Sequence, residues 1–131
     1  MAAETEQQIT WASSNSASVS GGASTTSDVE TISAGVVQAT LMMKADHSGT
    51  PADGDVVDFV LQYSIGDPDG ASTNEFTTPE HSHTVRADTF LEDPAIVLVG
   101  IPAPLVSLQI KAENGGGSSI TVSATLYEQT A

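Results

Sequence analysis

Residues 106–126 read VSLQIKAENGGGSSITVSATL and carry the clearest structural signal in the chain. Apolar residues stand at every second position on both sides of the central Asn-Gly-Gly-Gly. Because successive side chains of a β-strand point to opposite faces, this alternation predicts two half-buried strands. Glycine tolerates the positive φ of a tight turn, so residues 114–117 predict that the two strands form a hairpin.

The same period of two recurs in residues 36–46 (VVQATLMMKAD) and 57–65 (VDFVLQYSI). Residues 95–101 (AIVLVGI) are apolar throughout, which favours a central strand or one covered on both faces. Weaker candidates at 29–33 and 83–90 bring the number of strands to seven or eight, with Gly- and Pro-containing turns at 49–54 and 66–70. The sequence therefore predicts an all-β fold, an antiparallel β-sandwich that is jelly-roll-like. The residues expected in its core are Val37, Leu41, Met43, Phe59, Leu61, Val97, Val99, Leu108, Ile110, Val122 and Leu126.

The start of the chain differs in composition from the rest. Residues 1–27 are rich in Ser and Gly, which predicts a flexible N-terminal arm ahead of a sandwich domain at 28–131. Ile9 and Trp11 interrupt this polar stretch at strand-like spacing, and Trp11 is the one Trp of the sequence. Two interpretations stay open: a first strand that closes the sandwich, or an arm that contacts a neighbouring subunit through Gln7, Ile9 and Trp11.

Charge restricts the possible partners. Three Lys and Arg residues stand against 17 Asp and Glu residues, for a formal net charge of −14. Such a field repels phosphate backbones and anionic membranes, so we expect neither nucleic acid nor membrane as a partner. The sequence has no Cys, which suits a reducing cytosol, and residues 1–6 (MAAETE) show no export signal.

Two groups of residues are weak candidates for metal binding. His81 and His83 would project from one face of a strand, as two ligands of a zinc or iron site do. Asp67 and Asp69 lie in a tight turn that resembles the opening of a calcium loop, although the bidentate Glu of an EF-hand is missing. Neither group forms a full ligand set from its spacing, so exposed histidines and a plain surface turn are the favoured interpretations. We expect no cofactor and no required metal.

Motifs for covalent or hydrolytic chemistry are missing from the sequence. It contains no nucleophile elbow, no Cys-His pair and no phosphate-binding glycine loop followed by Lys. We therefore expect that the chain is not an enzyme. A metal-dependent cupin-like enzyme, resting on His81 and His83 alone, is the weakest alternative.

Four segments resemble small virion proteins of tailed bacteriophages: residues 9–24 (ITWASSNSASVSGGAS), 41–70 (LMMKADHSGTPADGDVVDFVLQYSIGDPDG), 91–104 (LEDPAIVLVGIPAP) and 112–129 (AENGGGSSITVSATLYEQ). The resemblance covers most of the chain and lies in overall pattern, with no catalytic motif. It implies a capsid decoration, or cement, protein that binds and stabilises the lattice of the major capsid protein or another virion protein. It also implies a homo-oligomer, a trimer by preference, assembled in the host cytoplasm and located on the capsid surface of the virion.

A carbohydrate-binding module of a phage tail or host-attachment protein is the second interpretation. Glycan platforms need exposed aromatic side chains. Of the six aromatic residues, three are expected to lie outside the core: Trp11, Phe76 and Tyr127.

Overall fold

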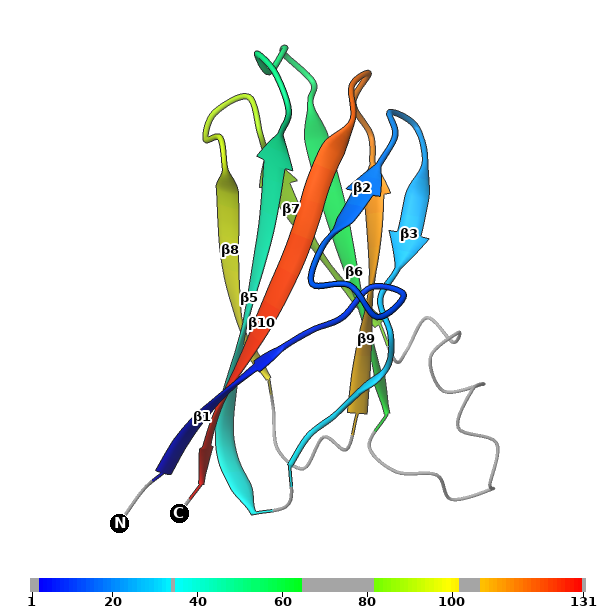
Figure 1. Ribbon diagram of the computed structural model, residues 1–131. Helices are drawn as coiled ribbons and strands as arrows, with labels where there is room; N and C mark the ends of the chain where they lie inside the picture. The colour runs from blue at the N-terminus through cyan, green and yellow to red at the C-terminus, as the bar shows by residue number, and fades with distance from the viewer. Residues whose placement is uncertain (1–2, 34, 65–81, 102–106, 131) are drawn as a thin grey trace.

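The computed structural model describes residues 3–33, 35–64, 82–101 and 107–130. They form ten β-strands in two antiparallel sheets, with no helix among them, which confirms the predicted β-sandwich (Figure 1). Accordingly, the described residues include no helix able to cross a membrane. The strands are β1 (Ala3–Gln8), β2 (Ala17–Val19), β3 (Ser24–Thr26), β4 (Glu30–Thr31), β5 (Val36–His47), β6 (Val56–Ser64), β7 (Ser82–Asp88), β8 (Ala95–Ile101), β9 (Ser107–Asn114) and β10 (Ile120–Thr130).

Each sheet has five strands. The first has the order β1-β10-β5-β8, with β2 also pairing with β10, and the second has the order β3-β9-β6-β7, with β4 also pairing with β9. The two layers enclose one core, to which both contribute the apolar side of their alternating strands. Ten of the eleven predicted core residues are buried or packed against this core.

Val37 is the exception, with 57% of its surface exposed. The pairing of β5 with β10 shifts at this point, because Gln129 lies opposite Gln38 while Thr130 lies opposite Val36. Val37 is thus the extra residue of a β-bulge, which breaks the alternation that holds from Ala39 to the end of the strand. The prediction of a buried Val37 is wrong for this reason.

The hairpin predicted at residues 114–117 is also wrong. Both flanking strands exist, but β9 pairs with β6 whereas β10 pairs with β5, in the other sheet. The turn therefore crosses from one layer to the other. Asn114 holds it: its amide nitrogen donates to the carbonyl oxygens of Val19 and Ser118, and its side-chain oxygen accepts from the backbone N–H of Gly116.

The expected N-terminal arm contributes strands to both layers. β1 pairs with the last strand, from Ala3 opposite Thr130 to Gln8 opposite Thr125, and the two ends of the chain leave the sandwich side by side (Figure 1). β2 and β3 pair with β10 and β9. A first strand therefore closes one edge of the sheet, but it ends at Gln8, before Ile9 and Trp11.

β8 occupies a position that the sequence did not indicate. It is the last strand of its sheet and pairs with β5 alone among the described strands, so the prediction of a central strand is wrong. Its even-numbered residues face outward, where Ile96 and Leu98 are 46% and 68% exposed. The seven residues are apolar on both faces of the strand. In the single chain, the outer face is exposed to solvent.

Candidate functional site

Among the described residues, three exposed features are candidates for a binding site: an apolar loop, the edge of β8, and a hollow on the outer face of the first sheet. The loop between β7 and β8 carries Phe90 and Leu91, which are 49% and 79% exposed. We call these two residues the apolar tip. Exposed apolar groups can mark contact surfaces, so the pair is a candidate for one.

The apolar tip is held by specific hydrogen bonds. Oδ1 of Asp88 accepts from the backbone N–H groups of Phe90 and Leu91, at 3.0 and 3.3 Å. Thr89, just before the tip, is fully buried and donates through both its N–H and its hydroxyl to the carbonyl oxygen of Asp55. The turn is thus anchored in the sandwich while its two apolar side chains point away from it. Such a tip needs little further ordering when it binds a partner.

A buried polar cluster lies beneath this end of the sandwich. Nε2 of His47 is 3.1 Å from Oδ2 of Asp55, and both side chains are almost fully buried. Nδ1 of His47 accepts from the N–H of Gly49 at 3.1 Å, which turns Nε2 toward the carboxylate. The backbone N–H of Ala52 donates to Asp55, and this bond, together with that from Gly117 and the nearby imidazole, holds the pKa of Asp55 below its usual value. The cluster joins three loops and faces the interior, so its role is structural.

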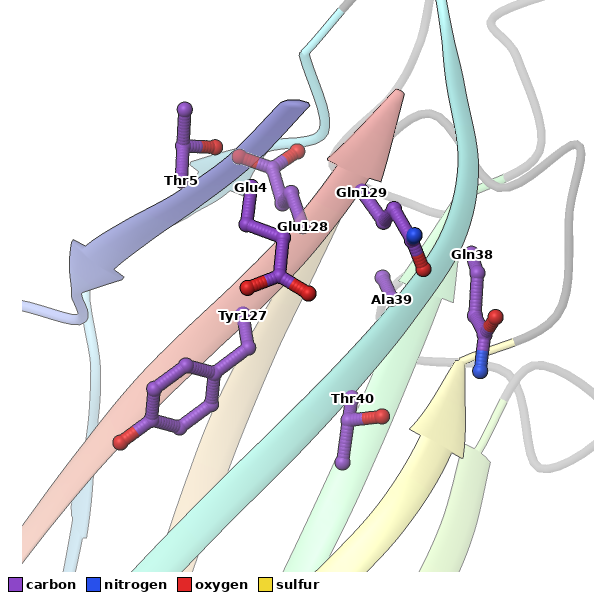
Figure 2. A pocket seen from close by; sticks show the side chains of 8 residues that line it. All are labelled: Glu4, Thr5, Gln38, Ala39, Thr40, Tyr127, Glu128 and Gln129. Carbon is purple, nitrogen blue, oxygen red and sulfur yellow. The ribbon is translucent and has the colours of Figure 1, made fainter. Parts of the chain in front are cut away.

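The hollow lies on the outer face of the first sheet, where β1, β10 and β5 run side by side (Figure 2). It has a volume of about 270 Å³. The pairing register places Tyr127 next to Thr40 and Gln129 next to Gln38, and Glu4 stands opposite Gln129 on the other side. The hollow therefore combines one partly exposed aromatic ring with amide, hydroxyl and carboxylate groups. The lining residues are Glu4, Thr5, Gln38, Ala39, Thr40, Tyr127, Glu128 and Gln129.

The inner side of the same region is closed by Glu128. This carboxylate is 2% exposed and accepts hydrogen bonds from the N–H and hydroxyl of Ser33 and from the amide of Gln7. Burial, and secondarily the charge of Glu128, raises the pKa of Glu30. Because the amide of Gln7 donates to Glu128, this side chain links β1 to β10 of the same chain.

The residues expected at a partner contact lie in the core of the same chain. Ile9 is fully buried and Trp11 is 3% exposed, both within the hydrophobic cluster. Neither side chain reaches the surface of the single chain, and their contact with a neighbouring subunit stays a prediction. Both residues follow β1, and the polar sequence around them does not reveal that their side chains are buried.

Of the four candidate metal ligands, the structure describes His83 alone. Asp67, Asp69 and His81 lie outside the described residues, and so does Phe76. His83 is exposed on β7, opposite Leu61. Within the described part of the chain, no group of three or more His, Asp or Glu side chains could hold a metal ion. The sequence reasoning did not identify the apolar tip, because exposure of Phe90 and Leu91 depends on the turn built by Asp88.

Comparisons with known proteins bear on the fold. No protein-family model matches the chain, and no curated protein matches it either. Three similar solved structures are the crystal structure of FLHE (12% identity, 97% of this chain and 96% of that chain, TM-score 0.46), a family 16 carbohydrate-binding module (14%, 82% and 70%, 0.39) and Desmodium yellow mottle tymovirus (8%, 99% and 87%, 0.44). With identities of 14% or less and TM-scores of 0.46 or less, these likenesses assign no function to the chain.

Proposed function

We propose that the chain is a non-enzymatic structural protein of a tailed-phage virion, and specifically a decoration protein that attaches to the major capsid protein lattice. The proposal rests on the sequence resemblance and on one structural observation, the apolar tip. A decoration protein must bind a preformed surface through non-covalent contacts. Phe90 and Leu91 supply an apolar contact that is already held in position by Asp88.

The distribution of charge supports the same role. The chain carries a net charge of −14, which would repel most acidic surfaces and keep decorated particles apart in solution. Attachment therefore depends on the places where apolar groups are exposed. Asp88 and Glu92 flank the apolar tip, so the matching site on the lattice should be an apolar pocket with basic residues at its rim.

The test is attachment of the purified chain to empty heads of the phage whose genome encodes it, measured by co-sedimentation. We expect saturable binding by the wild type and binding at least about tenfold weaker by Leu91→Glu, because the variant places a charge in the apolar contact. Val29→Glu is the matched control: Val29 is also an exposed apolar residue, but it lies between β3 and β4, and the strands β9 and β6 separate β3 from β7 in the same sheet. It should bind like the wild type.

Two results would count against this function. One is a lack of binding by the wild type to heads that lack any decoration. The other is a gene neighbourhood without capsid, portal or tail genes, which would remove the virion from the proposal altogether.

A second candidate, glycan binding by a host-attachment module, is favoured by the hollow around Tyr127. Protein sites for sugars combine an aromatic face with polar side chains that bond to hydroxyl groups. A hollow of about 270 Å³ lined by Thr40, Gln38 and Gln129 offers both on the scale of one or two sugar rings. Calorimetric titration with a panel of mono- and oligosaccharides tests it: a ligand whose binding is abolished in Tyr127→Ala supports the candidate, and no binding by the wild type dismisses it.

A further inference from the structure

The edge of β8 differs from the other edges of the two sheets. Its seven residues, Ala95–Ile101, include no charged residue and no proline. The opposite edge of the same sheet, β1, carries Glu4 and Glu6, while β7 carries Arg86 and Asp88 and β4 carries Glu30. Charges, proline and short strands are the usual means by which a sheet edge is kept from pairing with another strand. Among the described strands, β8 has a partner on one side and lacks all of these protections on the other.

The outer face of β8 is complementary to itself. Leu98 is the central residue of the strand, and Ile96 and Gly100 lie two positions to either side. In an antiparallel pair of β8 strands centred on Leu98, Ile96 of each copy stands opposite Gly100 of the other. The space above Gly100 is open, with no atom within 4 Å of the position that a Cβ would take. On each side of the centre, Ile96 of one copy thus packs into the open space above Gly100 of the other. At the centre, Leu98 of one copy contacts Leu98 of the other.

We propose that β8 binds a second copy of this chain by antiparallel strand addition, about a twofold axis through Leu98. The pairing extends the first sheet across two molecules and joins their outer β8 edges by backbone hydrogen bonds. On the inner face it brings Val97 opposite Val99, and both of these are only partly buried in the single chain. An interface that uses the same strand of both copies is isologous and closes at two.

Charge also selects this edge. Two copies with a net charge of −14 each repel one another, so a stable contact must keep carboxylates apart. Neither β8 nor β3 among the described edge strands carries an acidic residue, and of these two β8 is the long one, with seven residues against three. The contact is consequently apolar, and screening of the general repulsion by salt should strengthen it. This inference does not depend on attachment to a capsid.

Sedimentation equilibrium of the purified chain tests it without any capsid present. We expect a mass that rises with concentration from 13.4 kDa to twice that value, and a tighter dimer at high salt. Leu98→Glu places two carboxylates at the axis and should weaken the dimer by about a hundredfold or more. Val29→Glu changes the net charge equally in the other layer and should dimerise like the wild type.

Cross-linking provides a readout that does not rely on weakening the protein. The chain contains no cysteine, so Leu98→Cys introduces a single thiol. Residues directly opposite in an antiparallel pair have Cβ atoms about 4.5–5.5 Å apart, close enough for a disulfide to form with a small adjustment. Mild oxidation should convert Leu98→Cys to a covalent dimer within minutes and leave Val29→Cys mostly monomeric.

A wild type that stays at 13.4 kDa up to millimolar concentration overturns the inference, as does a dimer that survives Leu98→Glu. A trimer would also overturn it, because a twofold contact cannot close a ring of three, and would favour the threefold symmetry expected from the sequence resemblance. None of these results decides whether the chain binds the capsid, which the co-sedimentation experiment tests separately.

Discussion

Removal of Met1 to Ser24 should abolish cooperative folding. The deleted residues include β1, β2 and three core side chains, Ile9, Trp11 and Val19, none of which is more than 3% exposed. Truncating one buried Trp to Ala costs about 3–5 kcal/mol, and one buried Ile about 2–5 kcal/mol. Two such losses already approach the total of about 5–15 kcal/mol that holds a typical domain folded. The backbone pairing of β1 and β2 with β10 is lost in addition.

A single substitution measures how much the burial of Trp11 contributes to the free energy of unfolding. Trp11→Ala should lower the urea midpoint by about 2–3 M, taking a slope of roughly 1.5 kcal/mol per M. Circular dichroism in the β-strand region follows the transition in all variants. In the wild type, Trp11 is the one Trp of the chain, so its fluorescence reports directly whether the indole is shielded from water.

The control is Trp11→Phe. The indole Nε1 is buried without a hydrogen-bond partner, so replacement by Phe keeps most of the apolar contact and removes an unsatisfied donor. It should cost less than half as much as Trp11→Ala. The reasoning is refuted if the truncated chain unfolds at the wild-type midpoint, or if Trp11 of the folded protein emits like indole in water. Either result would instead support the interpretation of residues 1–27 as a flexible arm.

Four further predictions concern the rest of the sandwich. Leu108→Ala should destabilise the fold by about 2–5 kcal/mol, whereas Val37→Ala, at the bulge, should cost less than about 0.5 kcal/mol in urea unfolding. Gly21→Ala should lower the melting temperature, since its Cβ would lie 2.6 Å from a carbonyl carbon of the β9–β10 turn, while Gly49→Ala, in open space, should not. Because the folded-state pKa of Asp55 is below the usual 3.8, the unfolded chain takes up the proton first; stability should therefore fall as the pH drops below about 4, and less steeply in Asp55→Asn. Addition of EDTA should leave the melting temperature unchanged, and a drop of several degrees would indicate a metal ligand set.

Alternation of apolar residues was sufficient to locate the long strands. β5, β6, β9 and β10 all follow it, because each has one face in the core and one in solvent. The same signal could not say which strands pair. The residues around Gly116 satisfy a hairpin and a crossing between layers equally well, since both require glycine and leave the strand patterns unchanged.

Exposure at the candidate surfaces depends on tertiary context for a similar reason. The run at 95–101 indicates two apolar faces, but it does not say whether a strand of the same chain or another molecule covers the second one. In β1 the opposite holds: a polar strand pairs with β10 through its backbone, which composition does not reveal. Glu128 follows the inward period of β10, yet its burial requires Ser33 and Gln7 from distant parts of the sequence.

The pairing of Ala3 with Thr130 also sets the order in which the protein can fold during synthesis. On the ribosome, β1 emerges before β10 and has no partner until β10 has left the exit tunnel. Until then Ile9 and Trp11 lack the strand that carries Leu126 and Ala124, and the apolar faces of the nascent sheets stay open. Contacts over so long a separation close slowly. The acidic, polar residues of β1 would keep this unpaired segment soluble, so the composition that predicts a flexible arm also suits a strand that stays unpaired until β10 has been synthesised.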